Sequence, residues 1–256
     1  MAGFGDTSQL RGWKIVTSDT DSSHARYYES IFTLGNGYLG VRGAYEEAET
    51  VTLYEPLTLI AEVYDDPGMD EHPERLAPAP NWLRIDFDDG GGKLSTALST
   101  VLSETRTLDL KRGVLERHTR LQSDGGRITS IISSRLVSMA RPHVCAIAYS
   151  VIPENYSGSV KLTSSIDGAA TYGDGLLQTE AVSGRHIDST VCLAVRTLHS
   201  GIDICVAARH RLECGGREMQ ITGRLQEHVG SIGLVYEFEG EQGQVYTLEK
   251  TADLDT

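Results

Sequence analysis

The amino-acid sequence predicts an all-β fold, a large antiparallel super-sandwich of two sheets with little helix. Apolar and polar residues alternate along many runs of strand length, and glycine-rich turns separate these runs. No window has the apolar periodicity of an amphipathic helix of three turns, although residues 18–30 could hold one short helix and 213–228 are ambiguous. The strands number roughly a dozen or more, too many for an immunoglobulin-like domain, which indicates two large sheets packed face to face.

The clearest strands lie in the middle of the chain, where four long runs follow one another. These runs are residues 101–110, 113–122, 127–137 and 143–152, and further alternating segments lie at 83–88, 160–167, 202–208 and 234–239. The turn 123–126, Ser-Asp-Gly-Gly, joins the second run to the third. Residues 67–80 carry four of the seven prolines, and we expect an exposed excursion there. No internal repeat or linker is visible, so we expect residues 1–256 to form a single domain.

Composition and charge exclude several classes of function. The chain has 23 Lys and Arg against 36 Asp and Glu, and a net charge of −13 argues against a nucleic-acid partner. No run of apolar residues is long enough to span a membrane, and the first residues lack the apolar core of a signal peptide. Cys145, Cys192 and Cys205 lie in apolar runs, so we expect small core residues in a reducing cytoplasm. Histidine and cysteine spacing matches no metal site, and no cofactor is expected.

Residues 29–43, ESIFTLGNGYLGVRG, are the most informative segment of the chain. The dipeptide Asn36-Gly37 favours positive φ at both centres of a type I′ turn between two antiparallel strands. The segment holds four glycines, at Gly35, Gly37, Gly40 and Gly43. So many glycines predict a hairpin whose backbone closely approaches another surface.

The same letters match a dinucleotide-binding fingerprint, G-x-G-x-x-G, over residues 35–40. That fingerprint requires a preceding strand and a helix that opens at its end, so that the pyrophosphate meets the helix N-terminus. Here Val41-Arg-Gly43 follows, with a β-branched residue and another glycine where the helix should begin. Nucleotide binding is therefore disfavoured.

The glycine segment resembles the N-terminal signature of glycoside hydrolase family 65, which includes maltose, trehalose and kojibiose phosphorylases. Other blocks in the same order are similar to that family: Trp13, the acidic pair Glu46-Glu47, Ala79-Pro-Asn-Trp-Leu83, Leu108-Asp-Leu-Lys-Arg-Gly-Val-Leu-Glu-Arg117, Ser134-Arg-Leu-Val-Ser138 and Ser165-Ile-Asp-Gly168. Leu136 stands where the family more often has Phe. The likeness covers residues 13 to about 170 and fades to a general strand pattern beyond.

The resemblance implies a super-sandwich like that of galactose mutarotase, followed in the family by a helical linker and an (α/α)₆ barrel. The barrel supplies the general-acid glutamate and the phosphate site of an inverting reaction. The chain ends near where the linker should begin, so we expect the barrel to be absent from it. The resemblance then implies a non-catalytic N-terminal domain of a disaccharide phosphorylase or hydrolase acting on α-glucosides. Such a domain packs on the barrel of the same polypeptide, shapes the mouth of the sugar site and contributes to a homodimer.

Five residues near the signature are candidates for docking on the barrel or for lying close to the substrate. They are Asn36, Gly37, Tyr38, Arg42 and Glu46. No catalytic residue is assigned to this chain.

Simpler structural roles compete with each of these functional ones. The nearby carboxylates Glu29, Glu46, Glu47 and Glu55 can bind loop amides or pair with Arg42, and that interpretation is preferred over sugar binding. An aromatic residue beside Asn-Gly, such as Tyr38, is more often core than a sugar platform. Trp13 and Trp82 are the best aromatic candidates for sugar contact, with core again the simpler account.

An alternative function of a different class stays open, a sugar-binding or aldose-epimerase-like sandwich that acts on its own. Epimerase chemistry needs a general acid and a general base that face one sugar, usually His with a carboxylate. His118, His143 and His210 lie in strand-like runs, but no spacing singles out a pair.

Overall fold

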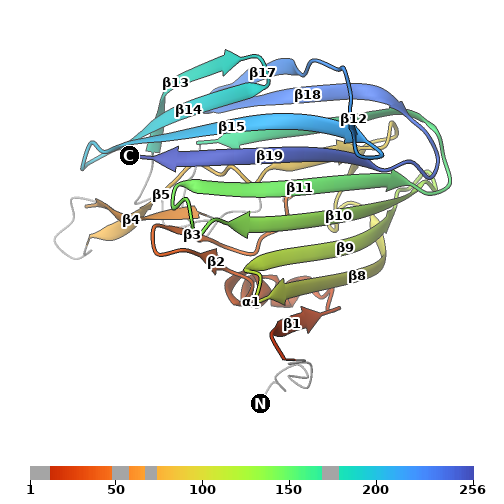
Figure 1. Cartoon of the computed structure of the whole chain (residues 1–256), viewed down its shortest axis with the longest axis horizontal. Coiled ribbons are helices and arrows are strands. Elements are labelled where there is room, and N and C mark those ends of the chain that lie inside the picture. The colour runs from red at the N-terminus through yellow and green to blue at the C-terminus, as the bar shows by residue number, and fades with distance from the viewer. Residues whose placement is uncertain (1–11, 48–57, 67–73, 169–178) are drawn as a thin grey trace.

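The computed structural model describes residues 12–47, 58–66, 74–168 and 179–256, and it confirms the all-β prediction (Figure 1). The strands are β1 (Lys14–Thr17), β2 (Leu34–Gly35), β3 (Leu39–Val41), β4 (Thr58–Asp65), β5 (Arg75–Pro78), β6 (Ile85–Asp88), β7 (Lys93–Leu94), β8 (Thr100–Asp109), β9 (Val114–Gln122), β10 (Ile128–Val137), β11 (Val144–Pro153), β12 (Gly158–Asp167), β13 (Thr179–Ile187), β14 (Thr190–Thr197), β15 (Asp203–Cys214), β16 (Arg217–Glu218), β17 (Arg224–His228), β18 (Ser231–Gly240) and β19 (Tyr246–Asp255). A short 3₁₀ turn, η1 (Ser22–His24), leads into helix α1 (Ala25–Ile31), as predicted for this region.

One long antiparallel sheet forms the first layer of the sandwich. Its strand order is β1-β8-β9-β10-β11-β19-β15-β14-β13, and β16 adds to β15 to make ten strands. Figure 1 shows β19 running between β11 and β15, so the last strand of the chain lies in the interior of the sheet.

Two smaller sheets form the second layer, where the sequence predicted one. The five-stranded sheet has the order β17-β18-β12-β6-β7, and the four-stranded sheet has the order β2-β3-β4-β5. An isolated bridge between Asn81 and Asp167 connects the segment after β5 to the end of β12. The single-domain prediction is not tested by these contacts.

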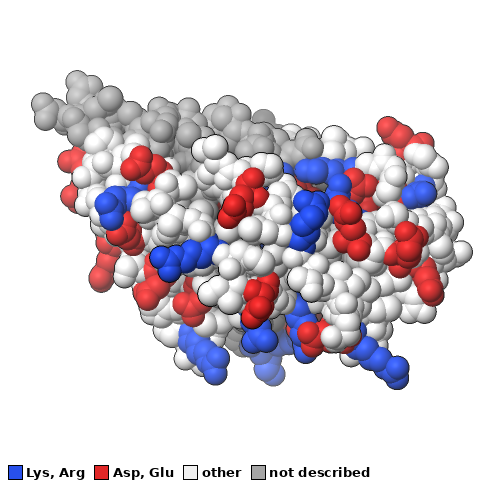
Figure 2. Space-filling model, turned by 90° about the horizontal axis from the view of Figure 1, so that it is seen from above, with Lys and Arg blue, Asp and Glu red and all other residues white. Residues whose placement is uncertain are grey.

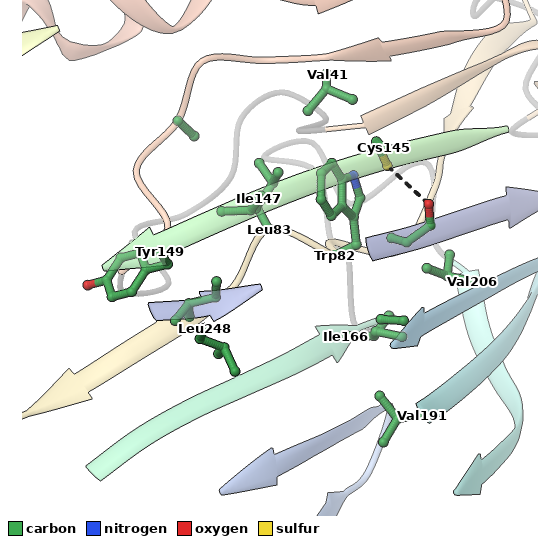
Figure 3. Packing of buried hydrophobic residues seen from close by; sticks show 14 of the residues in the cluster. Val41, Trp82, Leu83, Cys145, Ile147, Tyr149, Ile166, Val191, Val206 and Leu248 are labelled. Atoms are coloured by element: carbon green, nitrogen blue, oxygen red, sulfur yellow. Dashed lines mark hydrogen bonds between the residues drawn. The ribbon is translucent and has the colours of Figure 1, made fainter. Parts of the chain in front are cut away.

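The alternation in the sequence explains which face each strand buries. In β10, Ile131 and Val137 point into the sandwich while Ser130 and Leu136 point out. The buried apolar residues of both layers form one continuous cluster. Figure 3 shows Trp82 and Leu83, from the segment between β5 and β6, beside Ile147 of the long sheet, and Leu248 belongs to the same cluster. Trp82 is fully buried, so the core account of this side chain is the one the structure supports.

Two ionisable side chains are buried between the long sheet and the five-stranded sheet. Lys250 of β19 is fully buried, and its Nζ donates to the carbonyl oxygens of Ser165 at 2.8 Å and Arg84 at 3.3 Å. His210 of β15 bonds the Ser164 hydroxyl at 2.9 Å through Nε2. Burial in this low-dielectric layer lowers the pKa of Lys250 to about 7 and that of His210 to about 3.

Two local expectations from the sequence are wrong. The proline-rich segment is not an exposed excursion throughout, because residues 75–78 form β5 and residues 77–80 are buried; residues 67–73 lie outside the described part. The glycine hairpin does not have a type I′ turn at Asn36-Gly37. Gly37 has φ +89° but Asn36 is not among the residues with positive φ, so the turn centres are Gly37 and Tyr38, with the pattern of type II′.

Helices that could cross a membrane are not found in the part of the chain that the structure describes.

Candidate functional site

The glycine hairpin is formed by β2 and β3 and is tied to the long sheet by Asn36. The Asn36 side-chain oxygen accepts from the backbone amides of Tyr38 at 3.0 Å and Leu39 at 2.8 Å, which fixes the turn. The Asn36 amide group donates to the carbonyl oxygens of Ser138 at 2.7 Å and Pro142 at 2.8 Å, in the loop between β10 and β11. The Tyr38 ring packs on the His143 ring of the same loop, 4.2 Å between centroids. Asn36 therefore orients the tip of the hairpin from both sides.

Arg42 ties the other end of the hairpin to helix α1. Its side chain is half-buried, donates to the Ser30 hydroxyl at 3.1 Å and lies 3.6 Å from the Glu29 carboxylate. The backbone amide of Gly43 also donates to the Glu29 carbonyl oxygen at 2.8 Å. The structural role that the sequence favoured for Glu29, pairing with Arg42, matches this geometry.

The four glycines of the hairpin have different reasons to be glycine. Gly37 needs its positive φ, and a Cβ on Gly35 would lie 3.2 Å from the Leu39 carbonyl oxygen. A Cβ on Gly43 would lie 2.4 Å from the Phe32 Cβ and 2.9 Å from the Phe32 carbonyl oxygen. Gly40 has an ordinary φ, and no described atom lies within 4 Å of the place where its Cβ would stand.

We expect Gly43→Ala to destabilise the fold, because the clash involves the backbone and Cβ of Phe32, which cannot rotate away. The expected loss is about 1–3 kcal/mol in the free energy of unfolding, measured by urea denaturation. Gly40→Ala is the matched control on the same hairpin and should leave the unfolding midpoint unchanged or slightly higher. Equal losses in the two variants would contradict the close approach of Gly43 to Phe32.

A buried cluster of charges lies beneath the hairpin, on the inner face of the long sheet. Glu46 accepts from Arg135 at 2.6 Å and from Arg117 at 2.8 Å, and all three side chains are almost fully buried. Arg135 also donates to the carbonyl oxygens of Arg42 at 3.0 Å and Ala44 at 2.8 Å. Burial alone would raise the pKa of Glu46, but the two guanidinium groups outweigh it and lower that pKa to about 2. Glu46 is thus a permanent anion that fixes the backbone after the hairpin.

Glu47 belongs to the same cluster, but its pKa is shifted in the opposite direction. It accepts from Arg117 at 2.5 Å and from the Tyr149 hydroxyl. Burial raises the pKa of Glu47 despite Arg117, and the anion of Glu46 raises it further. The pKa values of these two adjacent carboxyl groups are therefore shifted in opposite directions.

The cluster continues along β8 through Glu104 and Arg106. Glu104 accepts from the Tyr45 hydroxyl at 2.6 Å and from Thr119 at 3.0 Å, and it lies 3.4 Å from Arg106. The Arg106 guanidinium lies 4.9–5.3 Å from the ring centroids of three aromatic side chains, and these are Tyr28, Phe32 and Tyr45. Aromatic faces stabilise a buried cation that has few hydrogen-bond acceptors.

This charged cluster supports the fold and shows no sign of an open reaction centre. Its three carboxyl groups, on Glu46, Glu47 and Glu104, balance three guanidinium groups, and all of these residues are at most 4 % exposed. A general acid must reach the substrate it protonates. The sequence made Glu46 a candidate for docking on the barrel or for lying close to the substrate, with a structural role preferred. Its carboxylate lies in this buried cluster, while Glu55 lies outside the described residues.

A separate polar groove of about 450 Å³ lies on the outer face of the five-stranded sheet. Its lining includes Arg84, Asp86, Lys93, Lys161, Thr163, Ser165, Asp167, Arg224, Gln226 and His228. Asp86 pairs with Arg84 at 3.2 Å and with Lys93 at 3.3 Å, so part of the positive charge is neutralised within the sheet. This groove was not predicted from the sequence, although the polar residues at the outward positions of β12 were an available signal.

The other aromatic and histidine candidates do not meet at one place. Trp13 is 65 % exposed at the start of the described chain, far in sequence from the groove-lining strands. His118 is exposed on the outer face of β9, His210 is buried between the layers, and His143 lies beside the hairpin. These three histidines therefore do not lie together, and His143 lies 3.4 Å from the exposed carboxylate of Asp255.

Figure 2 shows Lys and Arg side chains interspersed with Asp and Glu over the face seen from above, without one large basic patch.

Comparison with known proteins places these features in a family. The family model for the N-terminal domain of glycosyl hydrolase family 65 matches residues 15–256. An uncharacterized glycosyl hydrolase of Mycobacterium tuberculosis is 33 % identical over 260 residues, which cover 95 % of this chain and 19 % of that protein. The kojibiose phosphorylase of Halothermothrix orenii is 28 % identical, covering 94 % of this chain and 30 % of that enzyme.

The fold is shared with a solved structure assigned to kojibiose phosphorylase from human microbiome. The TM-score is 0.82 at 19 % sequence identity, over 95 % of this chain and 32 % of the other. The chain thus spans between 19 % and 32 % of the length of these proteins. It belongs to glycosyl hydrolase family 65, as the N-terminal β-sandwich domain of that family.

Proposed function

We propose that this chain is the non-catalytic N-terminal module of an inverting disaccharide phosphorylase or hydrolase acting on α-glucosides, and that its glycine hairpin docks on the catalytic barrel. Similar proteins are named kojibiose, trehalose and maltose phosphorylase, which supports a disaccharide substrate for the whole protein. The chain covers only part of each, which supports a further catalytic portion in the same polypeptide.

The proposal that the hairpin docks on the barrel rests on Gly40. Leu39 and Val41 point into the core, so Gly40 faces outward, and it pairs in register with Gly35 of β2. Two neighbouring strands therefore present bare backbone at the same place on the outer face. Neither positive φ nor any described neighbour requires glycine at Gly40. Glycine at such a strand position is typical of close approach by another backbone or a ligand.

The hairpin is also held in a fixed position before any partner arrives. Asn36 fastens its tip to the loop after β10, Arg42 fastens its base to α1, and Arg135 binds the following backbone. A preorganised surface loses little conformational entropy when it docks. In this proposal Asn36, Gly37, Tyr38 and Arg42 shape the mouth of the sugar site by position, and Glu46 supports them from below. A homodimer and a cytoplasmic setting belong to the same proposal.

The test compares this chain with a longer polypeptide that carries the catalytic portion from the same gene. Phosphorolysis and hydrolysis of maltose, trehalose and kojibiose are measured for both, and we expect turnover only in the longer polypeptide. In that polypeptide, Gly40→Leu should reduce kcat/KM by at least about tenfold, because a side chain prevents the close approach. Gly125→Leu is the matched control, since Gly125 has an ordinary φ in the exposed turn at the opposite end of β10.

Two results would contradict the proposal. Equal activity of the Gly40→Leu and Gly125→Leu variants would remove the hairpin from the docking surface. Turnover or saturable disaccharide binding by the 256-residue chain alone would favour the self-contained sugar-binding alternative, and the polar groove on the five-stranded sheet would become the site to examine.

A further inference from the structure

Two cysteines of the long sheet lie in direct contact. The Sγ atoms of Cys192 in β14 and Cys205 in β15 are 3.1 Å apart. The sequence predicted both as core residues, and this is wrong, because the alternating partners Val191 and Ile204 take the inward positions. Both cysteines face outward and are half-buried, whereas Cys145 is buried as predicted.

The strand register explains why the two sulfur atoms can meet. Cys192 pairs with Ala207, and Cys205 pairs with Ala194, so the cysteines are diagonal neighbours on one face. Both direct partners are alanines, and no bulky side chain separates the diagonal pair. A disulfide has a sulfur–sulfur distance of about 2.05 Å and Cα atoms usually within about 7 Å of each other, whereas diagonal neighbours lie roughly 7–8 Å apart, so the backbone must shift as the bond forms. Closing the bond therefore requires a movement of roughly 1 Å between two strands already bonded to each other.

The surroundings of Cys205 shift the pKa of its thiol. Burial, the neighbouring Cys192 and the carboxylates of Asp255 and Asp253 raise the pKa of Cys205 to about 12. Cys205 therefore keeps its proton near neutral pH.

We propose that Cys192 and Cys205 form an oxidisable dithiol, a modification site that a hydroperoxide converts to a disulfide. With hydrogen peroxide, a thiolate of the pair attacks one peroxide oxygen, which gives a sulfenic acid and releases hydroxide that takes up a proton to become water. The sulfur of the second cysteine then attacks the sulfenic sulfur, and the sulfenic hydroxyl leaves with the proton of that second thiol as a second water. Two thiols are oxidised and one hydroperoxide is reduced, with no other reactant.

The bond would join two strands next to the end of the described chain. Cys205 pairs with Asp255 of β19 on its other side, so the dithiol lies one strand from the last residues. A covalent link between β14 and β15 would stiffen the part of the sheet on which the end of β19 is supported.

The test is oxidation of the folded chain with hydrogen peroxide, followed by alkylation, trypsin digestion and mass spectrometry. Cleavage after Arg185, Arg196 and Arg209 puts Cys192 and Cys205 on different peptides, so their disulfide appears as a linked pair lighter by two hydrogens. We expect the count of free thiols to fall from four to two, and a reducing thiol to restore it. The Cys214→Ser variant should still form the linked pair.

Control variants test whether the folded geometry is responsible for forming the disulfide between Cys192 and Cys205. Cys192→Ser and Cys205→Ser should each abolish the linked pair. The proposal is overturned if the folded chain forms no such pair while Cys192 is alkylated freely in the same sample. It is also overturned if Cys192 and Cys205 oxidise separately to sulfinic acids, or if the pair forms only after unfolding in urea.

Discussion

Arg135→Leu is expected to lower the free energy of unfolding by about 3–5 kcal/mol, because it removes one partner of a buried ion pair. The substitution leaves Glu46 with Arg117 alone and deprives the carbonyl oxygens of Arg42 and Ala44 of their donor. Arg135 is one of the two guanidinium groups that lower the pKa of Glu46, so its loss leaves a buried carboxyl group with less compensation for its burial. Urea unfolding at pH 7, followed by circular dichroism, measures the change.

Arg120→Leu is the matched control for this prediction. Arg120 of β9 makes two hydrogen bonds to Glu154, at 2.8 and 2.6 Å, but its side chain is 46 % exposed. Exposed pairs contribute little, so the unfolding midpoint of this variant should stay near that of the parent chain. Similar midpoint shifts for Arg135→Leu and Arg120→Leu would show that the buried cluster does not hold the segment after the hairpin.

Lys250→Met is expected to change how stability depends on pH. The pKa of Lys250 is lowered from 10.5 to about 7 in the folded chain, chiefly by burial, with His210 and Cys145 as its ionisable neighbours. Between these two values the unfolded chain binds a proton that the folded chain does not bind. Stability of the parent chain therefore rises with pH in that window, by up to about 1.4 kcal/mol per pH unit, and the penalty for Lys250 is fully present only below pH 7.

The measurement is the difference in free energy of unfolding between the parent chain and Lys250→Met at several pH values from 6 to 10. Titrating groups that do not interact with Lys250 are common to both proteins and cancel in the difference, while the loss of the hydrogen bonds to Ser165 and Arg84 adds a constant. The difference should favour the Met variant most at low pH and shift steadily toward the parent chain above pH 7. Lys161→Met, on the outer face of β12, is the control, and a flat difference for Lys250→Met would contradict the buried position of its ammonium group.

The strand pattern was predictable because it depends on local alternation. The four long runs in the middle of the sequence became β8 to β11 with nearly the expected bounds, and Asp-Gly-Gly formed the predicted turn. The family resemblance was carried by blocks that include Arg117 and Arg135. Both arginines occupy inward positions of their strands, a signal of buried charge that was present in the alternation.

Other features could not be predicted from local sequence patterns because they depend on residues that are distant in sequence. Glu46 lies 71 and 89 positions from its two arginine partners, and no local pattern indicates which carboxylate will meet them. The proline content of residues 67–80 predicted an exposed excursion, but pairing with β4 holds part of this segment as β5. The cysteine pair was missed because an apolar run does not show which of its members faces outward.

The position of β19 has a consequence for synthesis of the chain. Residues 246–255 form β19, which fills the gap between β11 and β15. β19 follows all the other strands of this sheet in sequence, so it is the last of them to leave the ribosome. Until then β11 and β15 each carry a row of unpaired backbone groups, which is a template for association with other chains. Before residues 246–255 are made, the strands on either side of β19 cannot pair with one another, so closure of the sheet depends on the last strand in sequence order.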